Sequence, residues 1–210
     1  MLREMRGFRH LVAGMIVATL GACAARVPPP SPAPEQAAQC LAHLDQLAVG
    51  YTAAATPVSG HSACAVDNPV TVTATTIAWN QPGLVSCGFA VELDRFAREV
   101  VAPAAWRRFG KRVSLIRHFG TYACRRESGS GRWSQHATGR AIDIAGFALD
   151  DGTEISVEHD WRRSGPKRDF LRDVARGACE RFSMVLTPNS DREHYNHIHL
   201  DDGPYRRCGA

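Results

Sequence analysis

The stretches SQHATGRAID (residues 134–143) and HYNHIHLD (residues 194–201) contain four of the nine histidines of the chain. Each stretch also contains a short apolar segment, and we predict strands over residues 141–144 and 197–200. Side chains two residues apart on a strand face the same way, so His197 and His199 can address one point while Ile198 enters the core. The two stretches therefore indicate a cluster of polar side chains on one face of a sheet.

The residue types in this cluster are those that zinc accepts. Zinc binds neutral imidazole and carboxylate groups, and a catalytic zinc site keeps three protein ligands with the fourth position open for water. One histidine of the His197/His199 pair can then bind the metal while the other contacts the water. Either stretch alone is a weak signal, because such histidines are more often surface or satisfied core residues. Their combination favours a catalytic metal site.

The surrounding sequence predicts alternating helices and strands. The second firm helix is expected over residues 168–182, where Phe170, Leu171 and Val174 recur at helical spacing. A break at Pro103 is expected to divide the helical stretch 88–109. Asp150-Asp151-Gly152 is expected to turn a hairpin within 147–156, with Phe147 and Trp161 in the core. The remaining predictions are a helix over 38–48 and strands over 70–76, 113–117 and 184–186. These elements predict an α+β domain with helices packed on one side of a small, mostly antiparallel sheet.

The N-terminus has the features of an export signal. Arg3, Arg6 and Arg9 precede an uncharged run over residues 11–22, which is too short to span a bilayer. The run ends in small residues directly before Cys23, as in a bacterial lipoprotein signal in which that cysteine carries the lipid. The alternative is an ordinary signal peptide cut after one of the nearby alanines.

We expect residues 1–22 to be removed and residues 23–38, rich in proline and alanine, to form an extended tether to the membrane. Residues 39–210 then form one domain. Removal of residues 1–22 takes away three basic residues and one acidic residue, which leaves 22 basic and 20 acidic side chains. The basic residues are scattered as pairs, so we expect a solvated surface and no nucleic-acid partner.

Six cysteines remain after Cys23, and an even number in an exported chain indicates disulfides. No pair has the C-x-x-C spacing of a thiolate metal site, which disfavours that alternative and buried free thiols. Six cysteines allow 15 pairings, and the sequence alone does not choose among them. Nearest-in-order pairing closes the shortest loops, and it gives Cys40–Cys64, Cys87–Cys124 and Cys179–Cys208.

Two motifs resemble known zinc enzymes. The pattern His-x-x-Gly-x-Ala-x-Asp at 136–143, followed by His-x-x-His-x-His at 194–199, resembles zinc D-alanyl-D-alanine carboxypeptidases and murein endopeptidases. More of the chain, from about residue 40 to residue 208, is similar to the bacterial extensin-like C-terminal domain family. The residues that carry this second resemblance include Tyr122-x-Cys124-Arg125, the segment 141–147, Val185-Leu186-x-Pro188 and His194-x-x-His197-x-His199-x-Asp201.

The resemblance implies a zinc D-Ala-D-Ala-carboxypeptidase-like fold with His136, Asp143 and His199 as zinc ligands. It places His197 beside the water and His194 as a supporting polar residue.

The resemblance also places Arg125 where the peptidases polarise a carbonyl or hold a carboxylate, and a guanidinium suits that task. The alternative for Arg125 is an exposed arginine beside a disulfide cysteine. Glu193 is a rival general base, ranked below His197. Ser134 and Gly139 are expected to form the turn around the ligand loop. Asp201 is either a partner of a ligand imidazole or a solvated strand end.

These expectations describe a zinc-dependent peptidase of the cell envelope that acts on peptidoglycan peptide stems. We expect a periplasm-facing, lipid-anchored monomer. The rival is a zinc-containing wall-binding module without turnover, because the same ligands occur in the amino-terminal hedgehog signalling domain. A third alternative is a metal-free structural wall protein.

Overall fold

The computed structural model describes residues 34–210, which form one compact unit. The expected signal peptide, Cys23 and the tether up to residue 33 lie outside the described residues. Helix α1 spans Pro34–Gln46, so residues 34–38, expected to be tether, are helical. Among the residues described, no helix has both the length and the apolar character that crossing a bilayer requires.

The centre of the domain is a mixed β-sheet with strand order β1-β2-β3-β4-β5-β8-β7-β9, and β6 pairs with β5. Only β3–β4 and β7–β9 are parallel pairs among the described strands. The sheet is therefore mostly antiparallel, as the sequence predicts. The strands are β1 Gly50–Ala53, β2 Pro69–Ala74, β3 Ala78–Ser86, β4 Val113–Gly120, β5 Ala141–Leu149, β6 Glu154–Ser156, β7 Met184–Leu186, β8 Ile198–Asp201 and β9 Arg207–Cys208.

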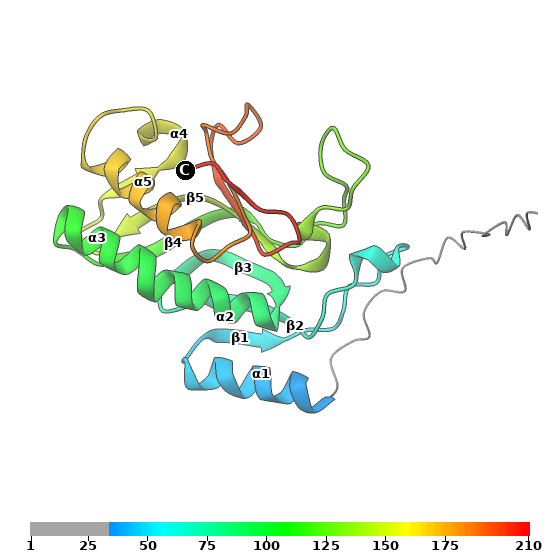
Figure 1. The fold of residues 1–210 in the computed structure, drawn as a ribbon. Coiled ribbons are helices and arrows are strands. Elements are labelled where there is room, and N and C mark those ends of the chain that lie inside the picture. Colours follow the sequence, from blue (N-terminus) through cyan, green and yellow to red (C-terminus); the bar gives the residue numbers. More distant parts are fainter. Residues whose placement is uncertain (1–33) are drawn as a thin grey trace, which may run out of the picture. The chain divides into compact units, whose positions relative to one another are not determined.

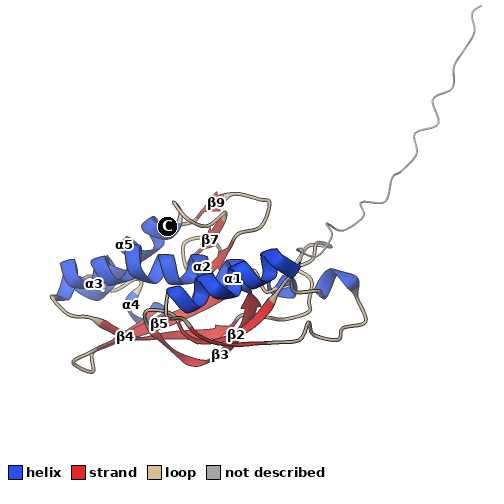
Figure 2. Ribbon diagram, turned by 90° about the horizontal axis from the view of Figure 1, so that it is seen from below, coloured by secondary structure: helices blue, strands red, loops and turns tan. Residues whose placement is uncertain are grey.

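Helices cover one face of this sheet (Figures 1 and 2). The described helices after α1 are α2 Cys87–Phe96, α3 Ala102–Phe109, α4 Val157–Asp160 and α5 Pro166–Ala178. Helix α5 ends four residues before the predicted boundary at residue 182. The structure thus confirms an α+β domain with helices packed on a sheet.

The predicted break at Pro103 is wrong. A π-helical segment, Ala97–Val101, joins α2 to α3 without interruption, and Pro103 lies in the first turn of α3. Proline has no backbone N–H to donate, and its ring crowds the preceding turn of a helix. The wider π turn before Pro103 accommodates both effects without ending the helix. Val101, Ala104 and Ala105 are fully buried, so packing holds the helical path through the proline.

Strands β1 and β3 were not predicted. Strand β3 contains Asn80, Gln81, Pro82 and Gly83, residue types typical of turns. Side chains replace part of its backbone ladder, because Asn80 and Gln81 both donate hydrogen bonds to the carbonyl of His118 on β4. The connection from β3 through α2 and α3 to β4 is a helical crossover, which a parallel strand pair requires.

The core lies between the helices and the sheet and is rich in aromatic side chains. Phe147 and Phe170 meet edge to face with ring centres 5.1 Å apart, and Phe182 contacts both Phe89 and Phe96. Trp161 is fully buried, so Trp161 and Phe147 are core residues as expected. Burial of one such side chain stabilises the fold by about 1.5–3 kcal/mol.

Three disulfides join the six described cysteines, and two of the expected pairings are wrong. The bonds are Cys40–Cys87, Cys64–Cys124 and Cys179–Cys208. Only the last pair was expected. The pairing follows element packing and not loop length: α1 packs on α2, and the 3-10 turn at Ser62–Cys64 packs on the turn at Gln135–Thr138.

We predict that peptide mapping of the unreduced protein will recover these three linked pairs. A proteolytic digest should release a peptide that links the segment of Cys40 to that of Cys87, separate from one that links Cys64 to Cys124. Reduction before digestion serves as the control and should abolish every linked mass. Recovery of a Cys40–Cys64 peptide would show that α1 does not pack on α2 as described.

Candidate metal site and cleft

Three side chains from separate elements converge on one point. His136 lies on the 3-10 turn Gln135–Thr138, Asp143 on β5 and His199 on β8. Their ligand atoms all lie within 4.8 Å of one another. His136 Nε2 is 3.2 Å from Asp143 Oδ2 and 3.2 Å from His199 Nδ1, which in turn is 2.9 Å from Asp143 Oδ1. The structure therefore brings together the three residues expected to bind metal.

Strand alternation places this cluster on the face of the sheet away from the core. Ile142, Ile144, Ile198 and Leu200 are buried in the hydrophobic core. The residues between them on β5 and β8 must point to the opposite face. Asp143 pairs directly with His199 in the antiparallel register of β5 and β8, so the two ligands are cross-strand neighbours.

The second nitrogen of each ligand imidazole is also engaged. His136 Nδ1 contacts the backbone carbonyl of Thr121, and His199 Nε2 lies 2.9 Å from Asp201 Oδ2. The backbone amide of Gly203 donates a hydrogen bond of 2.8 Å to the same carboxylate. A carbonyl or carboxylate on one ring nitrogen orients the ring and leaves the other nitrogen for a metal. Asp201 is thus a partner of a ligand ring and not a solvated strand end.

The cluster is electrostatically coupled. Burial alone would raise the pKa of Asp143, but hydrogen bonds from His136 and His199 outweigh burial and hold that pKa far below its ordinary range. Burial likewise would lower the pKa of His199, whereas hydrogen bonds to Asp143 and Asp201 raise it to about 9. The two carboxylates therefore stabilise the protonated form of the His199 ring.

His197 lies beside the cluster without belonging to it. Its Nε2 atom is 3.6 Å from Asp143 Oδ1, and its Nδ1 atom is 2.9 Å from Asn196 Oδ1. Burial lowers the pKa of His197 to about 4, despite the opposing attraction of Asp143. The ring is therefore neutral at neutral pH, and Nε2 is free to accept a proton.

His194 forms a hydrogen-bonded pair with Asp191 at the site. Its Nδ1 atom is 2.6 Å from Asp191 Oδ1, and its ring centre is 5.0 Å from that of His197. Asp191 also accepts hydrogen bonds from the backbone amides of Glu193 and His194. The sequence analysis missed Asp191, although an aspartate three residues before a site histidine on a loop is a recognisable capping pattern.

The cluster opens into a cleft of about 550 Å³. Arg125 and Glu193, both exposed, lie on its walls. The carboxylate of Glu193 accepts a hydrogen bond of 2.6 Å from Ser128, and no contact joins it to the three candidate ligands. The full lining is Arg125, Glu127, Ser128, Arg132, Ser134, Gln135, His136, Asp143, Met184, Leu186, Asp191, Glu193, His194, His197, His199, Asp201, Tyr205, Arg206 and Arg207.

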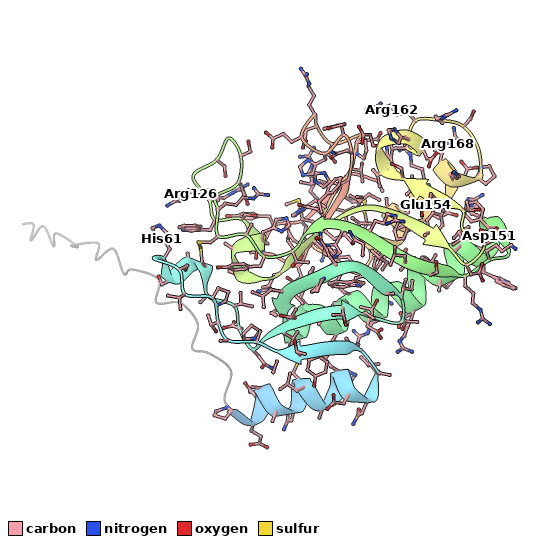
Figure 3. The ribbon with its side chains drawn as sticks, turned by 180° about the vertical axis from the view of Figure 1, so that it is seen from behind. His61, Arg126, Asp151, Glu154, Arg162 and Arg168 are labelled. Carbon is pink, nitrogen blue, oxygen red and sulfur yellow. A yellow bond between two sulfur atoms is a disulfide. The ribbon has the colours of Figure 1, made fainter. Side chains whose placement is uncertain are left out.

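A projecting hairpin forms one wall of the cleft. Arg126 and Trp133 form its β-bridge, and the Arg126 guanidinium lies 4.6 Å from the centre of the Trp133 ring. The Trp133 ring also meets the His61 ring, with ring centres 5.1 Å apart, and Figure 3 shows His61 and Arg126 together at one end of the domain. The Cys64–Cys124 disulfide joins the same two segments and so secures the hairpin base.

The turn that carries His136 depends on Ser134 and Gly139, as expected. The Ser134 hydroxyl accepts a hydrogen bond from the His136 amide, and Gly139 ends the turn with φ of 65°. An added Cβ at Gly139 would lie 2.8 Å from Val66 and 3.0 Å from the backbone nitrogen of Ser86. Both the left-handed backbone and the lack of space require glycine at this position.

The family described as "Extensin-like protein C-terminus" matches residues 38–209. The chain belongs to this family. No curated protein matches the chain with significant similarity.

We predict that Gly139→Ala will destabilise the domain by about 1–3 kcal/mol, the cost of a non-glycine residue in a strained backbone conformation. Urea unfolding followed by fluorescence provides the measurement. Gly131→Ala is the matched control, because nothing lies within 4 Å of its added Cβ and its φ is not positive. Equal stability of the two variants would contradict the close contact of Gly139 with β3.

Proposed function

We propose that this protein is a zinc-dependent peptidase that acts on peptidoglycan peptide stems in the cell envelope. One observation carries the proposal. The imidazoles of His136 and His199 and the carboxylate of Asp143 converge in a cleft, and the second nitrogen of each ring is held by a contact of its own. The neutral ring of His197 lies beside them and is not one of the three candidate ligands. This arrangement suits a catalytic site better than a closed structural one, which would use a fourth protein ligand.

His136, Asp143 and His199 would hold the zinc ion. The donor set of two nitrogens and one carboxylate oxygen matches zinc chemistry, and the contacts of the rings with Thr121 and Asp201 fit the outer support of such a site. When bound, zinc would supply the Lewis acidity that polarises a scissile carbonyl and lowers the pKa of water to about 7. We also propose that the domain has a zinc D-Ala-D-Ala-carboxypeptidase-like fold.

In this proposal His197 accepts the proton of the attacking water at Nε2 and returns it to the leaving amine. Its position beside Asp143 suits this task, because that carboxylate opposes the effect of burial and favours the protonated ring. His194, hydrogen-bonded to Asp191, packs against His197 and restricts its ring. Arg125 binds the carbonyl or carboxylate of the substrate from the cleft wall, with a fixed charge and a bidentate donor set.

The substrate and location follow from the features of an exported chain. A signal sequence over residues 1–22 with a lipidated Cys23 would place the domain at the envelope, where peptidoglycan stems are the abundant peptides. The disulfides among the described residues are consistent with an oxidising compartment outside the cytoplasm.

We predict that purified mature protein will bind about one zinc ion and that His136→Ala, Asp143→Ala and His199→Ala will each lose it. Loss of one of three ligands removes a large part of the coordination energy. Elemental analysis after zinc addition and dialysis measures occupancy, and His43→Ala, an exposed histidine on α1, is the control. Full zinc retention in any ligand variant would show that this residue is not a ligand.

We predict that the His197→Ala variant will fold and will retain zinc. Its rate of hydrolysis of purified sacculi should fall by about 10²- to 10⁴-fold, the range for a positioned acid–base group. Release of peptide products, followed by mass spectrometry, is the readout. Glu193→Gln is the comparison, because Glu193 lines the same cleft without contact to the ligands. If Glu193→Gln loses turnover and His197→Ala does not, Glu193 is the base.

If the zinc-loaded parent releases no product from any sacculus preparation, the peptidase proposal fails. The protein would then be better described as a zinc-containing wall-binding module. Sedimentation with sacculi would test that description directly.

A further inference from the structure

On the lining of the cleft, every acidic side chain has a partner, whereas two of the arginine side chains do not. Each carboxylate on its lining has a partner: Glu127 pairs with Arg132, Glu193 with Ser128, and Asp143, Asp191 and Asp201 with histidines. The arginines differ. The side chains of Arg125 and Arg206 make no hydrogen bond or ion pair with other residues in the described part of the chain, although both line the cleft. Two cations are therefore available to an anionic ligand.

The sheet register places Arg206 far from the candidate ligands. Asp201 on β8 pairs with Met184 on β7, which in turn pairs with Arg207 on β9. Neighbouring strands lie about 4.8 Å apart, so β9 is about 10 Å from β8. Arg206 immediately precedes β9. Met184 and Leu186 of β7 line the cleft between these two ends and provide an apolar floor.

The segment that carries Arg206 is held at several points. The Cys179–Cys208 disulfide ties it to the end of α5, and backbone hydrogen bonds join Arg207 to Ser183 and Gly209 to Val185. Before Arg206, the Tyr205 ring stacks on the Arg132 guanidinium at 4.6 Å. This C-terminal segment is held on both sides of Arg206. The backbone of Arg206 therefore has a fixed position in the wall of the cleft.

We propose that Arg206 binds a carboxylate of the peptide substrate at the end of the cleft remote from the metal ligands. This inference rests on the proposed peptidase function and specifies its substrate. An extended peptide advances about 3.3 Å per residue, so 10 Å corresponds to about three residues. The preferred substrate is then a peptide with a free carboxylate about three residues from the scissile bond. Arg125, whose backbone carbonyl accepts a hydrogen bond from Ser134 next to the turn that carries His136, acts on the reacting end.

A carboxylate fits this position better than other anions. The guanidinium fork matches the two carboxylate oxygens, and the floor of Met184 and Leu186 suits a chain with small apolar side chains. The neighbouring Arg207 is directed to the carbonyl of Ser190 at 3.4 Å, which leaves Arg206 as the unengaged donor. At this end of the cleft, the one guanidinium without a partner suits a single carboxylate, whereas a phosphate polymer would favour several unpaired cations.

The test compares the binding of fluorescein-labelled tetra-D-alanine, as free acid and as C-terminal amide, to the zinc-loaded mature protein. Fluorescence anisotropy within seconds of mixing gives both affinities, and mass spectrometry verifies that the peptides are intact. We expect the acid to bind about 10- to 100-fold more tightly, the range for a charge-assisted hydrogen bond. Arg206→Ala should abolish this preference without weakening amide binding, and Arg206→Lys should restore part of it.

Arg107→Ala is the matched control, because Arg107 is an exposed arginine on α3 that does not line the cleft. Equal affinity of the parent for acid and amide, or a preference retained in Arg206→Ala, would overturn the inference. So would a preference lost only in Arg125→Ala, or the absence of binding to either peptide. Digestion of sacculi distinguishes failure of this inference from failure of the proposed function. If the parent protein hydrolyses sacculi but binds acid and amide equally, only the role of Arg206 is rejected and the peptidase proposal remains.

Discussion

The pairing of β5 with β8 is the constraint on which the rest of the site depends. In this antiparallel register Asp143 stands directly opposite His199, while Ile142, Ile144, Ile198 and Leu200 on either side of them point into the core. A shift of β8 by one residue would turn His199 into the core and expose Ile198 and Leu200. Because burial of these apolar side chains is favourable, the hydrophobic core also holds the geometry of the polar cluster.

The polar cluster needs further support, because imidazole and carboxylate groups in a buried position must be paired. The backbone carbonyl of Thr121 and the carboxylate of Asp201 engage the outer ring nitrogens, and Asp201 is itself held by the amide of Gly203. The other ring nitrogens, His136 Nε2 and His199 Nδ1, then face the Asp143 carboxylate around one point. Such a cluster concentrates negative charge where a divalent cation would be stabilised.

The walls of the cleft come from three irregular segments that the sheet alone would not order. The 125–134 hairpin is anchored by Cys64–Cys124, and the C-terminal segment by Cys179–Cys208. Loop 187–197 is joined to the hairpin by the Ser128–Glu193 hydrogen bond. In Figure 1 these segments, in light green, red and orange, extend from the same side of the sheet. The disulfides therefore shape the walls of the cleft as well as stabilising the fold.

The sequence by itself determined the strand alternation around the candidate site, the α+β class and the aromatic core, because each depends on local spacing or residue chemistry. Its resemblance to zinc peptidases implied the three candidate ligands. Only the tertiary structure decided the partners of Cys40, Cys64, Cys87 and Cys124, the pairing of His194 with Asp191, and the place of Arg206 on the cleft wall. The disulfides and the arginine depend on how distant elements pack, which no local pattern encodes. The Asp191–His194 pair depends on a loop conformation that the surrounding fold selects.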